Sequence, residues 1–329
     1  MEAEALAQSA LMSRLNAIIV FLVILILRPF DGLAWNIPCH MLSGAIAYQI
    51  LQRENPAAIP VVRSILEKNP WYESRWKVQF ERLPQAQRDE MLFMLAARWA
   101  DEIRTRDKAE SRLPWHYVDF PFKPEGEPAS IQVVEPPQEN ILTAIVENTR
   151  IRTGNDPARR GVALAWLFHL IGDIHQPLHA IQLFSREYPN GDRGGGDFCV
   201  RVVQDRAPLS LHRLWDGLIT SSNNTRTLQN IAIELQSRFS KVSLSELAVT
   251  EPEALAKESF EIAVKIAYQN GALRGTPKGQ RKDCGEMTDA AVLSNGYANI
   301  ARKIADRRMM LAGYRLAALL QRISAKSVP

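Results

Sequence analysis

Residues 160–179 decide the fold and read RGVALAWLFHLIGDIHQPLH. The first half of this stretch carries apolar residues at helical spacing, which predicts a helix over 160–170 that runs into the polar residues beyond it. His169 and Asp173 are four positions apart, so they share one face of that helix. The end of an apolar helix therefore presents an imidazole and a carboxylate side by side.

A second pair with the same spacing strengthens this interpretation. His212 and Asp216 lie four positions apart in the motif LHRLWD. One such pair alone is equally consistent with a surface ion pair. In the first stretch, Pro177 is expected to bend or end the helix because it lacks a backbone donor, so His179 should point in a different direction. Two pairs and further histidines indicate a metal site rather than scattered core residues.

Short motifs elsewhere in the chain add to this set. The chain has six histidines, and His40, Asp101 and His116 each come shortly after a tryptophan. Imidazole and carboxylate supply the nitrogen and oxygen ligands that zinc prefers. The side chains in these motifs that suit a zinc cluster are His40, Asp101, His116, His169, Asp173, His179, His212 and Asp216.

Residues 1–34 are expected to be a signal peptide. Residues 17–27 form an apolar run of eleven, which is short for a membrane span and typical of a signal-peptide core. Arg14 supplies the positive flank, and Gly, Leu and Ala precede Trp35, so cleavage would make Trp35 the first mature residue. The acidic start is unusual, and Met12 gives a more ordinary initiation site. An uncleaved N-terminal anchor is the alternative.

The composition agrees with an exported soluble enzyme. The formal net charge of the 329 residues is +4, and a mildly basic surface suits a polyanionic substrate. Three cysteines are too few for a disulfide framework, so a packed core must supply the stability. At most one bridge can form, and Cys199–Cys284 is a conceivable pair that nothing in the local sequence supports.

The fold predicted for residues 35–329 is a single, mainly helical domain of the all-α class with a short β-hairpin. Glycines and alternating β-branched residues over 192–203 predict a loop and that hairpin. Thr250 and Glu253 form a capping-box pattern at the start of a helix. The expected helices cover 40–52, 84–104, 140–152, 160–170, 250–269 and 288–323.

The motifs just described carry a resemblance to a known family. The strings GDIHQPLH at 172–179 and LHRLWD at 211–216 resemble those of zinc-dependent single-strand nucleases. These are the type I nucleases of fungi and plants (nucleases S-one and P-one), which have exported bacterial relatives. The similarity extends from Trp35 to LAGYRLAALL at 311–320. It implies a mainly α-helical fold with a trinuclear zinc site at the bottom of a cleft.

The resemblance implies three zinc ions and assigns ligands to each. The first zinc is held by Asp101, His116, His169 and Asp173. The second is held by the α-amine and carbonyl oxygen of Trp35, by His40, and by Asp173 as the bridging ligand. The third is held by His179, His212 and Asp216. A terminal amine binds a metal only when it is free and deprotonated, so export and cleavage would complete the site.

The resemblance also implies how this centre acts on nucleic acid. Two zinc ions about 3.5–4 Å apart can share a hydroxide that serves as the nucleophile. Asp101 and Arg104 are the implied catalytic residues, although a surface arginine is the plain alternative for Arg104. Stacking of a base on an aromatic ring requires an unpaired base, which favours single strands. The implied substrate-binding residues are Tyr117 (which could instead be core packing), Asp119, Gly194, Gly195 and Gly196.

The chain departs from the family pattern in places that matter. Asn36 and Cys39 stand where the family has two glycines, and Gly196 stands where it has a base-binding asparagine. The change at Gly196 puts base preference in doubt, but not the phosphodiester chemistry. Cys39 precedes His40, so its thiol either lies near the second zinc or, as we expect, is buried and inert. His175 has no metal role in the family and is expected to be structural.

We therefore expect a zinc-dependent endonuclease that cleaves single-stranded DNA and RNA to 5′-phosphorylated products. Three Zn²⁺ ions are its expected cofactors, and 3′-nucleotides are a further expected substrate class. The protein should be a monomer, secreted or periplasmic, with no membrane anchor after cleavage. A zinc-dependent phospholipase C is the alternative, although that class typically has glutamate in place of Asp216. A non-catalytic binding module with a structural zinc is a third interpretation, which the complete ligand set disfavours.

Overall fold

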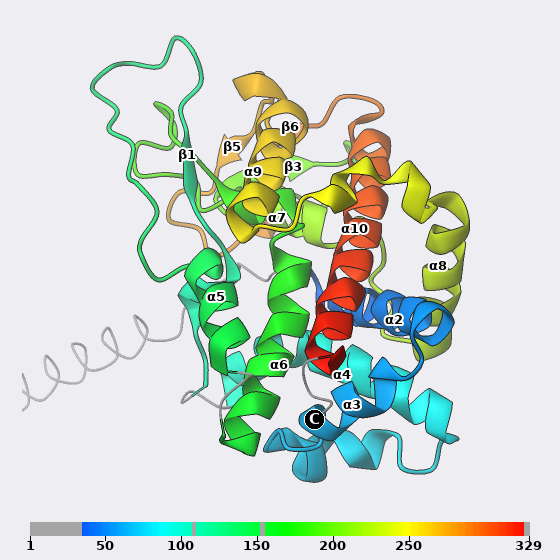
Figure 1. The fold of residues 1–329 in the computed structure, drawn as a ribbon. Coiled ribbons are helices and arrows are strands. Elements are labelled where there is room, and N and C mark those ends of the chain that lie inside the picture. The colour runs from blue at the N-terminus through cyan, green and yellow to red at the C-terminus, as the bar shows by residue number, and fades with distance from the viewer. Residues whose placement is uncertain (1–34, 107–109, 152–154, 326–329) are drawn as a thin grey trace, which may run out of the picture.

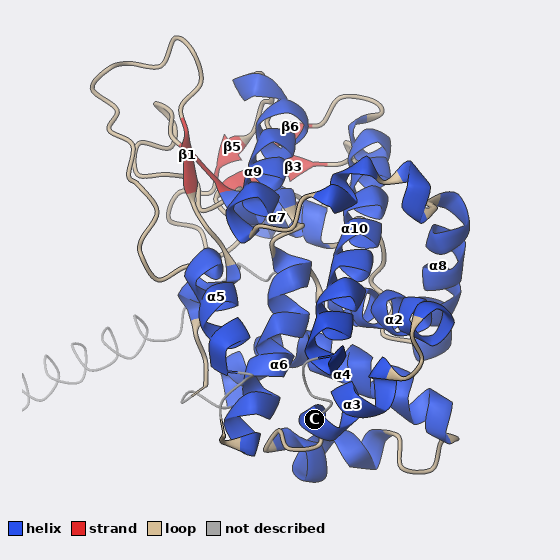
Figure 2. Cartoon of the chain, in the orientation of Figure 1, coloured by secondary structure: helices blue, strands red, loops and turns tan. Residues whose placement is uncertain are grey.

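A computed structural model describes residues 35–106, 110–151 and 155–325 of the chain. The predicted signal peptide at residues 1–34 and the start at Met12 lie outside the described residues. The described part is mainly helical, which confirms the predicted fold class (Figure 1, Figure 2). Its α-helices are α2 (Ile37–Glu54), α3 (Ala58–Leu66), α4 (Gln85–Arg106), α5 (Ile141–Ile151), α6 (Pro157–Asp173), α7 (Leu211–Asp216), α8 (Thr225–Arg238), α9 (Pro252–Ile262) and α10 (Tyr297–Ala325). No helix in these ranges is both long and apolar enough to cross a membrane.

Helix α6 contains the decisive stretch of the sequence. Asp156 caps its first turn by accepting two backbone N–H bonds, and Pro157 occupies the first position, where a missing donor costs little. The helix is buried along most of its length and ends at Asp173, four residues before the proline expected to stop it. That proline instead opens a short 3₁₀ turn, Pro177–Ala180. His179 lies in this turn and leaves the direction of α6, as predicted.

Helix α2 is central to the main hydrophobic core. It packs against α4, α8 and α10, and Asn36 caps its start by accepting from the N–H of Cys39. A Cβ added at Gly44 would lie 2.6 Å from the carbonyl oxygen of Phe93 on α4, so glycine permits this close approach. The packing of α2 on α4, and of α4 on α6, brings the candidate ligands of these three helices into one region.

Short strands gather at one end of the molecule, near α9 (Figure 1, Figure 2). β1 (Phe120–Phe122) pairs in parallel with β2 (Ile181–Leu183). A separate sheet forms around β3 (Phe198–Arg201), which pairs antiparallel with β4 (Leu209–Ser210) and β5 (Thr276–Pro277) and parallel with β6 (Ala291–Val292). Within the predicted loop and hairpin at 192–203, β3 is the one strand described, and its partners come from outside that stretch. β4 runs directly into α7 and so positions that helix.

Several predicted boundaries are wrong. The last helix, expected over 288–323, begins at Tyr297, because the residues before it form β6 and a loop. The helix expected over 250–269 begins at Pro252 without a side-chain cap, so the capping box at Thr250 is not formed. It also ends earlier, since a π-helical turn, Ala263–Ala267, follows it. Helices α3 and α8 were not predicted. α3 is short, and α8 buries three side chains among its fourteen residues, so its helical pattern is weak.

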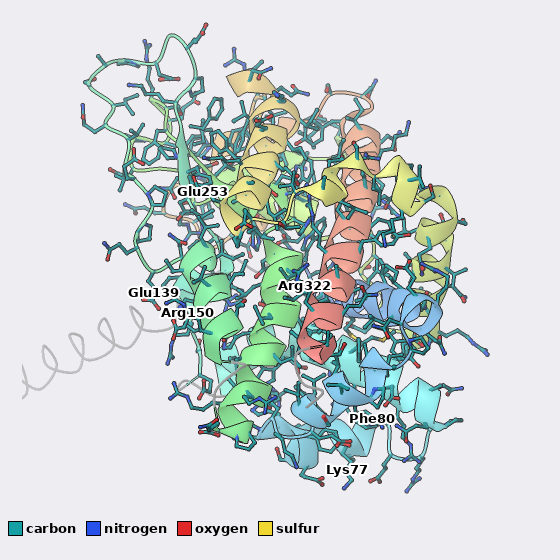
Figure 3. The ribbon with its side chains drawn as sticks, viewed as in Figure 1. Lys77, Phe80, Glu139, Arg150, Glu253 and Arg322 are labelled. Atoms are coloured by element: carbon teal, nitrogen blue, oxygen red, sulfur yellow. A yellow bond between two sulfur atoms is a disulfide. The ribbon has the colours of Figure 1, made fainter. Side chains whose placement is uncertain are left out.

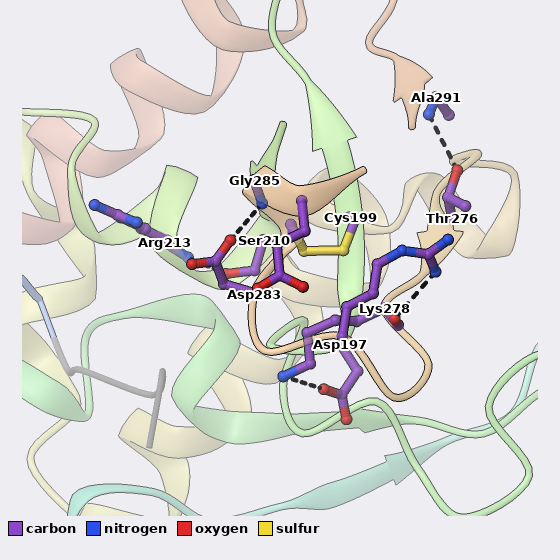
Figure 4. The surroundings of a disulfide bond; sticks show 12 residues. Asp197, Cys199, Ser210, Arg213, Thr276, Lys278, Asp283, Gly285 and Ala291 are labelled. Atoms are coloured by element: carbon purple, nitrogen blue, oxygen red, sulfur yellow. Dashed lines mark hydrogen bonds and ion pairs between the residues drawn. A yellow bond between two sulfur atoms is a disulfide. The ribbon is translucent and has the colours of Figure 1, made fainter. Parts of the chain in front are cut away.

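A disulfide bond joins Cys199 to Cys284 (Figure 4). It links β3 to the 3₁₀ turn Cys284–Glu286, across 85 positions of the sequence. The bridge is buried with Met287 and Ala290 in a small apolar cluster. The pairing that the sequence left as conceivable is therefore present. Such a bridge restricts the unfolded chain and so stabilises the sheet that precedes α7.

Candidate metal centre

The structure brings eight predicted ligand side chains together from six segments. They are His40 from α2, Asp101 from α4, His116 from the 3₁₀ turn Leu113–His116, His169 and Asp173 from α6, His179 from the turn Pro177–Ala180, and His212 and Asp216 from α7. All eight are buried. Three groups have ligand atoms within 4.8 Å of one another: His40, His169 and Asp173; Asp101, His116 and His169; His179, His212 and Asp216. Each group could hold a metal ion.

Asp173 is the residue on which the centre converges. Its Oδ2 lies 2.9 Å from Nε2 of His169 and 3.0 Å from Nδ1 of His116. Its Oδ1 lies 3.2 Å from Nε2 of His40 and 3.5 Å from Nδ1 of His179. The two oxygens of one carboxylate thus face imidazoles from four different elements. A carboxylate placed in this way can bridge two cations.

Backbone carbonyls orient three of the imidazoles. The bonds, all donated by Nδ1, run from His169 to the oxygen of Ala97 (2.8 Å), from His179 to that of His116 (2.8 Å), and from His212 to that of Gly194 (2.7 Å). Each bond places a proton on Nδ1, so that Nε2 of the neutral ring carries the lone pair. The backbone therefore selects the tautomers that metal binding requires.

The third group has a supporting residue of its own. Nε2 of His212 lies 3.7 Å from Oδ2 of Asp216, and the His212 ring stacks on that of His179. Gln176 donates from Nε2 to Oδ1 of Asp216 at 2.8 Å, while its Oε1 accepts a backbone N–H from the following turn. Gln176 was not among the predicted site residues. Its place inside GDIHQPLH, between two candidate ligands, is the signal that could have identified it.

The polar atoms of the centre fit metal ions. Thirteen buried side-chain nitrogen and oxygen atoms of the described chain lack a hydrogen-bond partner, and seven of them belong to this centre. They are Nδ1 and Nε2 of His40, both carboxylate oxygens of Asp101, Nε2 of His116, Oδ1 of Asp173 and Nε2 of His179. A buried polar atom without a partner costs about 1–3 kcal/mol. Cations bound here would satisfy several of these atoms at once, and the mixed imidazole and carboxylate set suits zinc.

The electrostatics of the centre also favour cations. Burial opposes ionisation of Asp173, but the surrounding imidazoles, led by His169, hold the pKa of that carboxyl well below its usual range. Burial likewise disfavours the charged form of His169, yet the carboxylates of Asp173 and Asp101 outweigh it and raise its pKa to about 9. Burial raises the pKa of Asp216 well above its usual range, and the Gln176 amide opposes this only in part. A cation at the third group would reverse that shift and keep Asp216 ionised.

Trp35 lies beside the centre with its side chain fully buried. Its indole Nε1 donates to the carbonyl oxygen of Gly172 at 3.0 Å, one residue before Asp173. The next backbone N–H, that of Asn36, donates to the carbonyl oxygen of Asp216 at 3.3 Å. The main chain at residues 35–36 is therefore held between the ends of α6 and α7, where candidate ligands lie. The ligand role of the Trp35 terminus stays a prediction.

Two neighbouring residues are engaged in structural contacts. Cys39 is buried with its Sγ 3.7 Å from the carbonyl oxygen of Thr220, and burial raises the pKa of its thiol to about 12. This supports the expectation of an inert thiol. His175 uses both ring nitrogens: Nδ1 donates to the carbonyl oxygen of Ile171, and Nε2 accepts from Arg315, each at 2.7 Å. His175 thus has no nitrogen left for a metal and instead braces the turn between α6 and His179.

Three of the residues expected to contact substrate, Arg104, Tyr117 and Asp119, interact electrostatically. Nη1 of Arg104 is 3.9 Å from Oδ1 of Asp101, and its side chain is 14% exposed, so it borders both the centre and solvent. Burial raises the pKa of Tyr117; the Asp119 carboxylate adds to this rise, and the guanidinium groups of Arg104 and Arg193 oppose it. Burial, aided by a second carboxylate, raises the pKa of Asp119 to about 7. The charges of these groups therefore act on the Tyr117 hydroxyl.

The three predicted glycines lie in a buried loop that supports His212. Gly194 has φ +57°, and a Cβ there would lie 2.4 Å from the carbonyl oxygen of Leu178. Asp192 holds the loop in place by accepting from the N–H of Gly195 and from the hydroxyl of Tyr268. The loop in turn offers the carbonyl that orients His212. The structure thus gives these glycines a positioning role, and direct contact with substrate stays a prediction.

A mainly helical chain that gathers imidazoles and carboxylates into three adjacent buried groups defines a candidate multinuclear metalloenzyme. The S1/P1 nuclease family matches residues 35–325, and the chain belongs to this family. The chain is similar to Endonuclease 4 and Endonuclease 3 of Arabidopsis thaliana, with 28% and 27% identity over 68% of this chain and 75% and 74% of those proteins. It is also similar to Nuclease S1 of Aspergillus oryzae, at 24% identity over 70% of this chain and 78% of the relative. The family match confirms the resemblance drawn from the motifs, and it makes the chain a phosphodiester hydrolase of the nuclease type.

Proposed function

We propose that this protein is an exported zinc-dependent endonuclease that cleaves single-stranded DNA and RNA and leaves 5′-phosphates. The observation that carries the proposal is the convergence of four imidazoles on the two oxygens of buried Asp173. Seven buried polar atoms of the same centre have no hydrogen-bond partner. A set of bound cations would supply the missing partners. Three groups of ligand atoms support a stoichiometry of three zinc ions.

The protein's own residues prepare this centre for phosphodiester hydrolysis. Zinc, when bound, supplies a Lewis acid that activates water and withdraws charge from the phosphoryl group. The carbonyls of Ala97, His116 and Gly194 hold the ligand imidazoles in the required tautomer, so little reorganisation accompanies binding. Arg104, at the border of the centre and solvent, is placed to neutralise charge on the phosphate. Asp101 holds that guanidinium at 3.9 Å while facing the centre with the same oxygen.

A base-binding role for Tyr117 and Asp119 accounts for strand preference. Tyr117 follows the candidate ligand His116 directly in the chain, and its ring is only partly buried. A base stacked there and bonded to the Asp119 carboxyl would have to leave a duplex, at a cost of a few kcal/mol. The proposal therefore predicts faster cleavage of unpaired strands. The same residues would bind a 3′-nucleotide, because its base and its 3′-phosphate are separated as they are within a nucleic-acid strand.

Export is supported by two observations. Residues 17–27 have the length and composition of a signal-peptide core. The Cys199–Cys284 disulfide belongs to an oxidising compartment, since such bonds are rare in the cytosol. We infer that the protein acts in the periplasm or outside the cell, as a monomer.

Metal analysis combined with a substrate panel tests the proposal. Protein starting at Trp35 should contain three zinc ions, lose activity in excess EDTA, and regain it with zinc. The panel compares single-stranded DNA, single-stranded RNA, duplex DNA, 3′-AMP and phosphatidylcholine at equal enzyme concentration. Preferred hydrolysis of the single strands, with 5′-phosphate ends, is the expected result. Full activity without metal, 3′-phosphate ends, or hydrolysis confined to phosphatidylcholine (the phospholipase C alternative) would refute it.

A further inference from the structure

A cavity of about 510 Å³ lies away from the metal centre and is of the size range of small-molecule sites. It is lined by residues of α2, α5, α9, α10, the end of α6 and the segment 241–250, and none of the eight candidate ligand side chains lines it. The cavity is partly open to solvent, so a ligand can reach it.

The walls of the cavity are apolar and belong to the core. Its buried lining side chains include Ile50, Ile145, Leu255, Ala317 and Leu319. They come from α2, α5, α9 and α10, so the hollow continues the main hydrophobic core. Most of its lining surface is apolar, although polar and charged side chains also contribute to it. A hydrocarbon chain is the ligand that such walls would bind.

The exposed residues that line the cavity are mostly basic. Arg322 of α10, Lys241 and Arg150 of α5 are exposed there, and Glu54 is the one carboxylate among the described lining residues. Glu54 already pairs with Lys241 at 3.2 Å. Figure 3 shows Arg150 on α5 and Arg322 on α10, on the face turned to the viewer. An anionic head group would find a guanidinium among these residues.

A neighbouring groove has the opposite character. It shares Val146, Arg150 and Pro252 with the cavity, but its other charged residues are Glu147, Glu251 and Glu253. An anion would be repelled by this acidic side and attracted towards Arg322. The charges therefore favour an orientation in which the anionic head group of an amphiphile lies near Arg322 and away from the acidic groove.

We propose that this cavity binds a long-chain carboxylate, with its alkyl chain between α5, α9 and α10 and its head group beside Arg322. The inference is independent of the nuclease proposal, since it uses none of the metal-centre residues. Arg315, a buried residue of the lining, is already engaged by Glu258 and His175. The exposed guanidinium of Arg322 is therefore a better partner for the head group than that of Arg315.

Binding of straight-chain carboxylates of 8 to 16 carbons to the whole mature protein tests the proposal. Calorimetric titration below the micelle concentration should show affinity that rises about four-fold per methylene. The rise should stop at the length that fills the cavity. The alcohol of the same chain length should bind at least about ten-fold more weakly, because it lacks the charge attracted by Arg322. An alkylamine should bind more weakly still.

Three variants distinguish the cavity from non-specific adsorption. Ala318→Trp, which fills the cavity from its partly exposed wall, should abolish binding without lowering the unfolding temperature. Arg322→Glu should weaken the carboxylate and leave the alcohol unchanged. Arg82→Glu, the same charge change at an exposed site that lines no described cavity, should have no effect. The proposal is overturned by an absence of binding in the unaltered protein, by affinity that climbs through 16 carbons in all variants, or by equal loss in Arg322→Glu and Arg82→Glu.

Discussion

Oδ2 of Asp173 lies 2.9 Å from Nε2 of His169, one helical turn earlier in α6. Residues four apart on a helix project in the same direction, so this one helix delivers both groups to the same point. The other oxygen of Asp173 faces imidazoles from α2 and from the turn after α6. A change at Asp173 therefore affects most of the centre, whereas a change at a peripheral ligand affects one group.

Asp173→Asn should be more damaging than Asp216→Asn. The first substitution weakens a carboxylate whose two oxygens face four imidazoles, and the second weakens a carboxylate that belongs to one candidate metal group. We expect loss of about 1,000-fold or more in kcat/KM on single-stranded DNA for Asp173→Asn. Zinc content and rate should be measured on both variants, with circular dichroism to verify folding. A larger loss of zinc and rate in the Asp216 variant would exclude the bridging role.

Gln176→Ala should weaken zinc binding at the third group. The Gln176 amide orients Asp216 at 2.8 Å, and loss of such a supporting bond typically reduces metal affinity by about 10- to 100-fold. Retained zinc after dialysis against a graded chelator gives the measurement. Gln229→Ala, which removes a side-chain bond to Glu90 instead, is the matched control. Equal zinc retention in the two variants would mean that Gln176 is not a positioning residue.

Protein that begins at Ala34 should be less active than protein that begins at Trp35. One extra residue converts the Trp35 amine into an amide, which is a poor metal ligand because its lone pair is delocalised. We expect one fewer tightly bound zinc and a rate reduced by about 100-fold or more. The other two groups consist of internal side chains and should keep their zinc. Equal zinc content and rate for the two proteins would show that the terminal amine is not a ligand.

Tyr117→Ala should lower kcat/KM on single-stranded substrate, while Tyr117→Phe should preserve it. Stacking of one base on an aromatic ring contributes about 1–3 kcal/mol, which corresponds to a loss of about 5- to 150-fold. The phenylalanine variant keeps the ring and removes the hydroxyl. Rates on single-stranded and duplex DNA should converge in the alanine variant. If both variants lose activity equally, Tyr117 acts through its hydroxyl or through packing, and the stacking role fails.

Base preference should depend on pH through Asp119. Its pKa is raised to about 7 by burial, so the carboxyl is protonated below that pH and ionised above it. A carboxylate matches the two adjacent donors of guanine, whereas a carboxylic acid, with one donor and one acceptor, matches adenine. The ratio of kcat/KM for 3′-GMP over 3′-AMP should therefore rise as pH increases through about 7.

The ratio of two substrates cancels effects of pH on the metal centre, which both share. Asp119→Asn carries a donor and an acceptor at every pH, so its ratio should be flat and should favour adenine. A pH-dependent ratio that persists in the Asp119→Asn variant would assign the effect to another group.

The sequence alone determined the class of fold and the identity of the candidate ligands. His169 and Asp173, like His212 and Asp216, are joined by helical spacing, which is a local property that can be read from residue numbers. The motif strings also predicted the family, which the match over residues 35–325 confirmed. The Cys199–Cys284 pairing, by contrast, was only one conceivable bridge, because 85 positions of sequence say nothing about distance in space.

Tertiary structure decided which of these residues are in contact. The convergence on Asp173 requires α2, α4 and α6 to pack together, and no local pattern states which helix faces which. The bonds of Gln176 to Asp216, of Tyr268 to Asp192 in the glycine loop, and of Arg315 to His175 are long-range contacts of the same kind. The start of α10 also depends on tertiary structure, because pairing of β6 with β3 overrides the local helical pattern before Tyr297. Local spacing sets which side of an element a residue occupies, and packing sets what lies opposite it.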